Sequence, residues 1–304
     1  MQTHTVPFGG WPNNIALSNS HAELIVTTDV GPRIISFKTP RGQNVLKNYA
    51  EQMGGSGESE WKIRGGHRLW IAPEGDISYA LDNSPVKHEV TGNTVRLEND
   101  PVAPWGIRKT LTISLAENSP EVTLHHKITN ESQAEVELAS WALSVMAPGG
   151  LEIIPLPPLG EHPRDLLPNR LIVSWPYTDM TDPRWRFGWK FITLRQTQDG
   201  GPTKLGLAHR EKWVAYLNGD SLFVKTFGYE EGAHYPDFGC NFETFSNTEM
   251  LEVESLGPLR KLKPGESTDH VEKWYIFGEV AQPASLQEQD LAAWIQPLLA
   301  SVGL

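Results

Sequence analysis

The sequence predicts an all-β protein, an antiparallel β-sandwich that forms a single domain over residues 1–304. Short segments of alternating apolar and polar residues recur along most of the chain, as expected for strands with one buried face. Clusters of Gly, Pro, Asn and Asp separate these segments and predict turns. Only one segment, near the C-terminus, has apolar residues at helical spacing. No internal repeat and no linker divides the chain.

The first half of the chain contains most of the clear strand patterns. A Gly31-Pro32 turn separates the first two strands, and the composition of residues 53–59 predicts a flexible loop. Few clean strand patterns occur between residues 39 and 85. Strands are expected at residues 22–28, 33–38, 86–90, 94–98, 107–115, 122–129 and 135–145. The last three are joined by short turns and predict a meander, in which His126 shares a face with apolar neighbours and is expected in the core.

The second half begins with a proline-rich region at residues 155–189, which predicts loops. Asn218-Gly219-Asp220 then predicts a hairpin turn. Strands are expected at residues 204–208, 213–217, 221–226, 248–255 and 268–277. Ser285 can cap a C-terminal helix whose apolar positions run from Leu286 to Leu299.

Composition excludes several classes of function. The net charge is −11 with only 26 Lys and Arg, which argues against a nucleic-acid partner, because such binding depends on phosphate neutralisation. Cys240 is the only cysteine, so an intrachain disulfide and a cysteine-based zinc site are excluded. Neither a signal peptide nor an apolar run long enough to span a membrane is recognisable. We therefore expect a cytoplasmic protein without a membrane partner, although secretion of a longer precursor stays open, and we expect no cofactor.

Residues 61–75 carry an unusual number of side chains that bind ligands. A Gly65-Gly66 pair permits a close approach of the backbone to a neighbour. Aromatic rings and charged donors surround this pair and are typical of a binding site. They are Trp61, Arg64, His67, Arg68, Trp70 and Glu74. The alternative interpretation is a bend with a buried tryptophan, a satisfied histidine and two surface arginines.

The strand expected at residues 248–255 carries two carboxylates. Its two-residue period places Glu252 and Glu254 on one face, with Leu251 and Val253 on the other. Two neighbouring carboxylates in a pocket raise the pKa of one of them, which suits a general acid or base. The alternative is a polar face in contact with water.

Residues 228–243 form a third candidate region. This segment is acidic and aromatic, and it includes Glu230, Glu231, His234, Asp237 and Glu243. We expect a loop that closes on a polar ligand, with His234 and Asp237 as contacts. Its spacing matches no established metal motif, so no metal is predicted, but metal binding here and a simple connecting loop both stay open.

Two segments resemble the galactose mutarotase-like superfamily of β-supersandwich proteins. Residues 63–73 are similar to the Arg-Gly-Gly…Pro segment of hexose-6-phosphate mutarotases. Residues 250–258 with the turn at 262–267 are similar to the late strand that carries the general-base glutamate of that family. The stretch from Gly65 to Trp70 is most similar to an uncharacterised subfamily, domain of unknown function 4380. The resemblance covers most of the chain and implies the β-supersandwich fold.

The resemblance implies an aldose 1-epimerase-like isomerase that acts on a small-molecule carbohydrate. Glu254 matches the base, and Arg64 matches an arginine of the substrate pocket. Trp141 stands where the family has its mid-chain catalytic histidine, which leaves His67 as the candidate acid facing Glu254 across one cleft. Arg64, Arg68, Trp70, Glu74, Trp141, His234, Asp237 and Glu252 are the expected substrate contacts.

Two other functions stay open. One is a non-catalytic carbohydrate-binding protein on the same fold. The other is a lyase or hydrolase that uses Glu252, Glu254 and Asp237. The sequence does not identify the sugar, and two arginines are suited to a phosphate or a uronate carboxylate as well.

Overall fold

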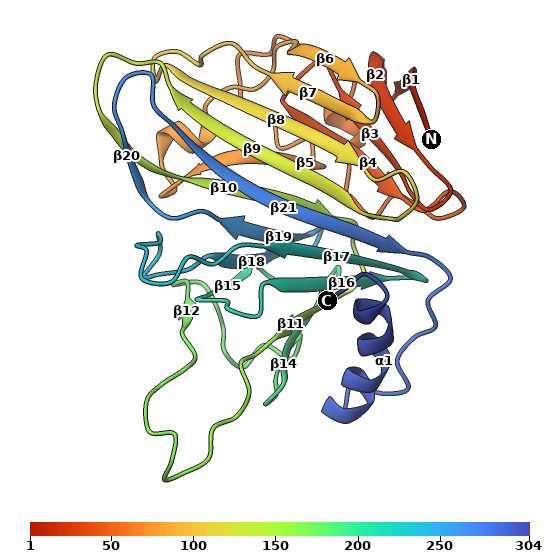
Figure 1. The fold of residues 1–304 in the computed structure, drawn as a ribbon, viewed down its shortest axis with the longest axis vertical. Coiled ribbons are helices and arrows are strands. Elements are labelled where there is room, and N and C mark those ends of the chain that lie inside the picture. The colour runs from red at the N-terminus through yellow and green to blue at the C-terminus, as the bar shows by residue number, and fades with distance from the viewer.

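Two large antiparallel sheets, packed face to face, make up the protein, as seen in a computed structural model that describes all residues 1–304 (Figure 1). The eleven-stranded sheet has the order β1-β2-β3-β4-β5-β10-β19-β18-β15-β12, with β20 paired to β10. The ten-stranded sheet has the order β13-β14-β11-β16-β17-β21-β9-β8-β7-β6. One C-terminal helix, α1 (Glu288–Ala300), completes the fold. The predicted antiparallel β-sandwich is therefore confirmed.

The strands of the eleven-stranded sheet are β1 (Gln2–Phe8), β2 (Trp11–Ser18), β3 (Glu23–Thr27), β4 (Arg33–Lys38), β5 (His67–Ala72), β10 (Val136–Met146), β12 (Ile172–Ser174), β15 (Thr203–Leu207), β18 (Phe242–Ser246), β19 (Leu251–Leu256) and β20 (Arg260–Leu262). Those of the other sheet are β6 (Lys87–Thr91), β7 (Thr94–Glu98), β8 (Ile107–Leu115), β9 (Val122–Asn130), β11 (Leu151–Pro155), β13 (Trp185–Phe187), β14 (Phe191–Arg195), β16 (Trp213–Asn218), β17 (Ser221–Phe227) and β21 (Ser267–Phe277). Two short 3-10 helices, η1 (Ala50–Gln52) and η2 (Asp76–Tyr79), lie in the loops around β5.

The main core lies between the sheets and takes alternate side chains from both. Leu24, Phe37 and Val253 from one sheet and Leu124 and Trp274 from the other are almost fully buried in it. Burial of such side chains contributes about 25 cal/mol per Å² of apolar surface, which makes this layer the principal source of stability. Helix α1 covers a separate apolar cluster on the outside of β11, β16, β17 and β21 (Figure 1).

The sequence analysis missed nine strands, β1, β2, β5, β11, β12, β13, β14, β18 and β20, and two of them show no alternation of buried and exposed residues. Every residue of β5 and of β11 is buried, so their sequences do not show the two-residue period of a half-exposed strand. The expectation of few strands between residues 39 and 85 overlooked β5, and the loop expected up to residue 189 overlooked β12 and β13. The predicted C-terminal helix is confirmed, but it begins at Glu288 with Gln287 at the N-cap position, so Ser285 is not its cap.

Lys225 joins the two sheets at the centre of the sandwich. It projects from β17, is fully buried, and its Nζ lies 2.7 Å from Glu272 Oε1 of β21. The same ammonium donates to the carbonyl oxygens of Ala142, on β10, and Val253, on β19, at 3.2 and 3.0 Å. A cation of one sheet is thus bonded to the backbone of two central strands of the other.

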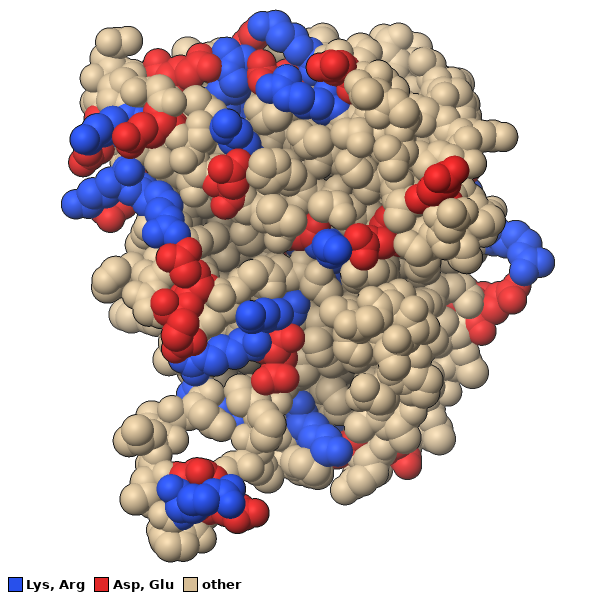
Figure 2. Space-filling model, viewed as in Figure 1, with Lys and Arg blue, Asp and Glu red and all other residues tan.

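Charged residues of both signs are interspersed over the face shown in Figure 2. No helix has the length and apolar character needed to cross a membrane.

Gly65 has positive φ and packs against the backbone of a neighbouring segment. A Cβ atom at this position would lie 2.0 Å from the carbonyl oxygen of Lys47. Gly57 has nearly the same φ, +80° against +82°, but no atom lies within 4 Å of the corresponding position. A comparison of substitutions at Gly65 and Gly57 therefore distinguishes the cost of backbone strain from the cost of a steric clash.

We predict that Gly65→Ala destabilises the protein more than Gly57→Ala. Both variants force alanine into the left-handed region, at a cost of about 1–2 kcal/mol. Only Gly65→Ala adds the conflict with Lys47, which should cost a further ~2 kcal/mol or more. Chemical denaturation measures both values; equal losses would show that the contact at Gly65 is relaxed at little cost.

Candidate functional site

The candidate site lies on the outer face of the eleven-stranded sheet. Five adjacent strands contribute to it in the order β5, β10, β19, β18 and β15. Paired residues of neighbouring strands share a face, so the pairs Trp70–Trp141 and Glu243–Glu254 project to the same side. Glu254 is also paired with Leu143, which in turn is paired with Arg68. The register therefore brings Arg68, Trp70, Trp141, Glu243, Glu252, Glu254 and Lys204 onto one surface.

Glu254 is the centre of a buried charged cluster. Its Oε2 accepts hydrogen bonds from Trp141 Nε1 at 2.8 Å and from Lys204 Nζ at 3.0 Å. Lys204 also lies 2.7 Å from Glu243 Oε2. Burial opposes the charge on Lys204, but Glu254 and Glu243 outweigh it and raise the pKa of the ammonium above its usual range. One cation thus serves two carboxylates in a site almost closed to water.

Glu252 has a different environment on the same strand. Its Oε1 lies 3.8 Å from an Arg68 nitrogen, beyond hydrogen-bond distance. Burial, and then the charge of Glu254, raise the pKa of Glu252 from 4.5 to about 7, although Arg68 and Lys204 act in the opposite direction. Glu252 is therefore a carboxylic acid that exchanges its proton near neutral pH, beside a second carboxylate.

Several buried polar atoms of this surface have no hydrogen-bond partner. They include Glu252 Oε1, Glu254 Oε1, Glu243 Oε1, Arg68 Nε and Trp61 Nε1. Buried polar atoms are normally paired, because each unsatisfied group costs about 1–3 kcal/mol. A molecule with several hydroxyl groups would satisfy both carboxylates and the guanidinium.

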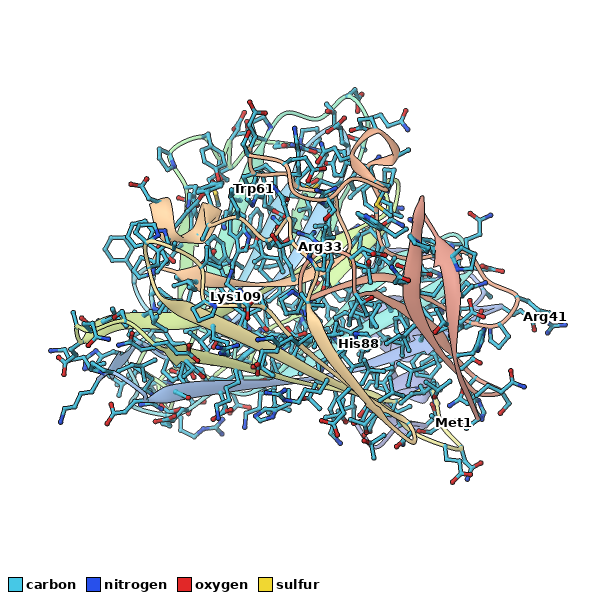
Figure 3. All side chains as sticks on the ribbon, turned by 90° about the horizontal axis from the view of Figure 1, so that it is seen from above. Met1, Arg33, Arg41, Trp61, His88 and Lys109 are labelled. Atoms are coloured by element: carbon cyan, nitrogen blue, oxygen red, sulfur yellow. The ribbon has the colours of Figure 1, made fainter.

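Aromatic rings surround these polar groups. Trp70 lies 5.5 Å from Trp61, 5.0 Å from Tyr79 and 5.3 Å from Trp141, measured between ring centroids. The Arg68 guanidinium lies over Trp70 at 4.4 Å and over Trp61 at 5.1 Å. Figure 3 shows Trp61 among the loops, on the side opposite the ten-stranded sheet. Trp70 and Trp141 are nearly buried, whereas Trp61 and Tyr79 keep exposed surface, and their apolar faces suit the C–H groups of a sugar.

Glu74 lies at the rim of this aromatic group. Its carboxylate is exposed and accepts a hydrogen bond from the Tyr79 hydroxyl. Tyr177 is also half exposed, and its pKa is raised to about 12 by burial and by the nearby carboxylates of Glu254, Glu74 and Glu243. Both tyrosines are therefore neighbours of the charged cluster and open to solvent.

His67 does not face this surface, so the predicted pairing of His67 with Glu254 across one cleft is wrong. His67 is paired with Ser144, whereas Glu254 is paired with Leu143. Consecutive residues of β10 point to opposite faces, so His67 points between the sheets. Its Nδ1 lies 2.9 Å from Ser144 Oγ and its Nε2 lies 2.8 Å from His126 Nε2.

The hydrogen bonds around His67 form a complete chain. His126 Nδ1 must donate to the carbonyl oxygen of His270, so its Nε2 accepts from His67 and His67 Nδ1 accepts from Ser144. Burial and the neighbouring His126 hold the pKa of His67 well below its ordinary value of 6.5. His67, His126 and Glu272 approach one another closely enough to suggest a metal. However, Glu272 already accepts from Trp274 and lies against Lys225. The predicted core position of His126 is confirmed.

Arg64 makes no ion pair or hydrogen bond with the charged cluster around Glu254, so its role as a substrate contact stays a prediction. Its guanidinium donates to the Gln52 carbonyl, to Glu58 and to Asn83. These bonds hold the loop before β5, and the guanidinium lies over the ring of Trp11. The two terminal nitrogens of Arg64 are thus engaged in structure and only its Nε lacks a partner, whereas Arg68 lies beside Glu252.

The segment 228–243 lies at the edge of the site. His234 is exposed, and the backbone carbonyl of Asp237 accepts from the Cys240 thiol. Neither side chain contacts the charged cluster, so their role as ligand contacts stays a prediction. The three glutamates considered as metal ligands are each ion-paired instead, Glu230 with Arg260, Glu231 with Arg210 and Glu243 with Lys204.

Sequence reasoning missed the central role of Lys204. Its strand was recognised, but its partners come from β18 and β19, and no local pattern shows which strands are neighbours. The only available signal was the position of Lys204, an isolated lysine directly before the apolar residues of its strand.

Solved structures of known proteins share this fold. A galactose mutarotase-like protein from Lactobacillus casei superposes with a TM-score of 0.57 and 11% identity, over 87% of this chain and 100% of that one. A galactose mutarotase related enzyme from Lactobacillus acidophilus gives 0.51 and 9%, over 88% and 98%. The Slr1438 protein from Synechocystis gives 0.59 and 12%, over 91% and 100%. Neither a family model nor a curated protein matches the sequence. The chain thus has the galactose mutarotase-like β-sandwich fold, and at these identities the likeness establishes the fold alone.

We predict that Glu252→Gln changes the pH dependence of stability. The folded protein holds the Glu252 proton up to a pH of about 7, whereas the unfolded chain releases it near 4.5. Between these values Glu252 makes the wild type lose stability as pH rises, and the glutamine variant lacks this contribution. At about 1.4 kcal/mol per pKa unit, the advantage of the variant should grow by about 3 kcal/mol over this window.

Urea denaturation across this pH range measures the effect. Glu89→Gln, at an exposed position of β6, is the control and should show no such trend. A constant difference between the Glu252 variant and the wild type would show that the pKa of Glu252 is not raised.

Proposed function

We propose that the protein binds a sugar at this outer surface and interconverts its anomers, as an aldose 1-epimerase does. The observation that carries the proposal is the pair of buried carboxylates on β19, each with an oxygen that lacks a partner. The fold of the mutarotase-like structures and the surrounding aromatic rings support it.

Glu254 is suited to the role of base. Trp141 and Lys204 both donate to its Oε2, which stabilises the carboxylate charge and leaves Oε1 free toward a ligand. Oε1 would take the proton of the anomeric hydroxyl, as the C1 oxygen becomes a carbonyl and the bond from C1 to the ring oxygen breaks.

Glu252 replaces His67 as the proposed acid. A neutral carboxylic acid can protonate the ring oxygen as the ring opens, and the pKa of about 7 keeps Glu252 protonated in a large part of the molecules near neutral pH. After rotation about the bond between C1 and C2, the two proton transfers run in reverse and the ring closes on the other anomer. No proton is consumed over the cycle.

The charges of the surface favour a neutral sugar. Lys204 is already bonded to two carboxylates, and Arg68 donates to the Ile63 carbonyl and lies beside Glu252. A phosphate or uronate would have to compete with these internal partners and would meet four nearby glutamates, Glu74, Glu243, Glu252 and Glu254. We therefore expect unphosphorylated sugars to bind better than their phosphates.

Non-catalytic sugar binding on the same fold is the second candidate. It is favoured by the position of His67 on the inner face and by Trp141, which occupies the place of the family's histidine and bonds to Glu254. The two candidates share the binding surface and differ only in turnover.

We predict that Glu254→Gln abolishes anomer exchange and retains the fold. Loss of a general base typically costs about 10²–10⁴ in rate. Two-dimensional exchange NMR on a panel of free aldoses measures the rate, with Glu89→Gln as a control. Binding without exchange in the wild type would leave the second candidate, and unchanged exchange in the variant would remove Glu254 as the base.

We further predict that the exchange rate falls as pH rises through about 7. The acid must be protonated, so the active fraction decreases as Glu252 ionises at its pKa of about 7. In Glu252→Gln the remaining activity should lack this descending limb. A wild-type profile that is flat between pH 6 and 8 would contradict Glu252 as the acid.

A further inference from the structure

A hollow of about 680 Å³ opens beside Leu256, the C-terminal residue of β19. Its walls come from β17, β21 and the segments that follow β17 and β19. None of the carboxylates on the outer face lines it. The floor includes His270, a residue that plays no part in the proposed mechanism and is only 7% exposed.

The hydrogen-bond network behind His270 determines its tautomer. Glu272 is held by the Lys225 ammonium and by Trp274 Nε1, so as a carboxylate it can only accept. Ser255 must therefore donate its hydroxyl proton to Glu272. The Ser255 oxygen, 2.6 Å from His270 Nε2, then accepts from that nitrogen. His270 carries its proton on Nε2, and Nδ1 is left as a bare acceptor.

His270 Nδ1 has no partner within the protein. It lies beside Gly257, where a Cβ atom would be 3.7 Å away, and both residues line the hollow. An imidazole nitrogen that lacks a protein partner, on a nearly buried side chain that lines a hollow, is suited to accept a hydrogen bond from a ligand. The complementary group is a hydroxyl or an N–H.

The rest of the wall is aromatic. Phe227, Tyr229 and Tyr235 line it, and the two tyrosine rings are stacked with centroids 5.4 Å apart and an angle of 6° between their planes. Three charged side chains at the rim are already paired, Glu230 with Arg260, Lys273 with Glu121 and Asp269 with His125. The other two, Glu211 and Lys212, have opposite charges, so the lining has no excess of unpaired charge. A neutral ligand with an apolar face and hydroxyl donors fits both the wall and the floor.

We propose that this hollow is a second carbohydrate site, which takes a neutral sugar ring with one hydroxyl donating to His270 Nδ1 and its C–H groups against the aromatic wall. This proposal does not depend on the function of the outer surface, because the two sites share no side chain. Both sites can therefore be occupied, emptied or mutated independently.

The experiment uses methyl glycosides of glucose, galactose and N-acetylglucosamine, which bind as sugars but cannot interconvert anomers. Long-range ¹H–¹⁵N spectra follow the His270 nitrogens, and ring signals of Tyr229 and Tyr235 follow the wall. We expect an unprotonated Nδ1 in the free protein and shifts of these signals with at least one glycoside.

Two variants of His270 distinguish the role of the Nδ1 acceptor from that of the structural hydrogen bond between Nε2 and Ser255. His270→Gln retains a donor toward Ser255 and removes the Nδ1 acceptor, so the shifts of the tyrosine signals should be lost. His270→Asn keeps an acceptor near the position of Nδ1 and should retain them. His4→Gln, on the exposed strand β1, is the control. If His270→Gln does not fold, Tyr229→Ala removes half of the stacked pair and should abolish the shift of the remaining Tyr235 signals.

The outcomes distinguish the two sites. Glu254→Gln should leave the response of Tyr229 and Tyr235 unchanged. The second site is overturned if no glycoside shifts these signals in the wild type, if His270→Gln responds like the wild type, or if the response disappears in Glu254→Gln.

Discussion

The two-residue period of the central strands is the constraint on which the structure depends. On β19, Glu252 and Glu254 point outward while Val253 and Ser255 point between the sheets. On β10, Trp141 points outward and Ser144 inward. The same few strands therefore carry two separate polar networks, one on each face, and the backbone plane between them keeps the networks apart. Alternate residues of one strand thus belong to different networks, the candidate site on the outer face and the buried network between the sheets.

Each network solves the problem of buried charge with one lysine. Lys204 stabilises Glu243 and Glu254 on the outer face, and Lys225 stabilises Glu272 between the sheets. A buried carboxylate without such a partner would cost several kcal/mol. The difference lies in how complete the pairing is. Glu272 has all its acceptors engaged, whereas Glu252 and Glu254 keep oxygens without partners. Glu152 and Glu243 also keep oxygens without partners, so incomplete pairing supports our assignment of Glu252 and Glu254 to ligand binding only together with their shared face on β19.

Period and composition alone predicted the fold class, most of the half-exposed strands and the shared face of Glu252 and Glu254. They failed for His67, because its face relative to Glu254 depends on the pairing of β5 with β10, and that register is a tertiary property. β5 is buried along its length and showed no alternation. Lys204 was missed for a related reason, since its carboxylate partners lie on other strands. A sequence pattern shows which residues of one strand share a face, but it does not show which residues of two different strands do.

The bonds of Lys225 to the Ala142 and Val253 carbonyls have a mechanical consequence. They attach the floor of the outer surface to the second sheet, directly behind Glu254. Side chains above that floor, such as Tyr79 and Tyr177, belong to loops and are half exposed. Under the proposed function, entry and exit of the sugar would fall to the loops, while Glu252 and Glu254 keep fixed positions. Substitutions in these loops would then change which molecules are admitted without moving the two carboxylates.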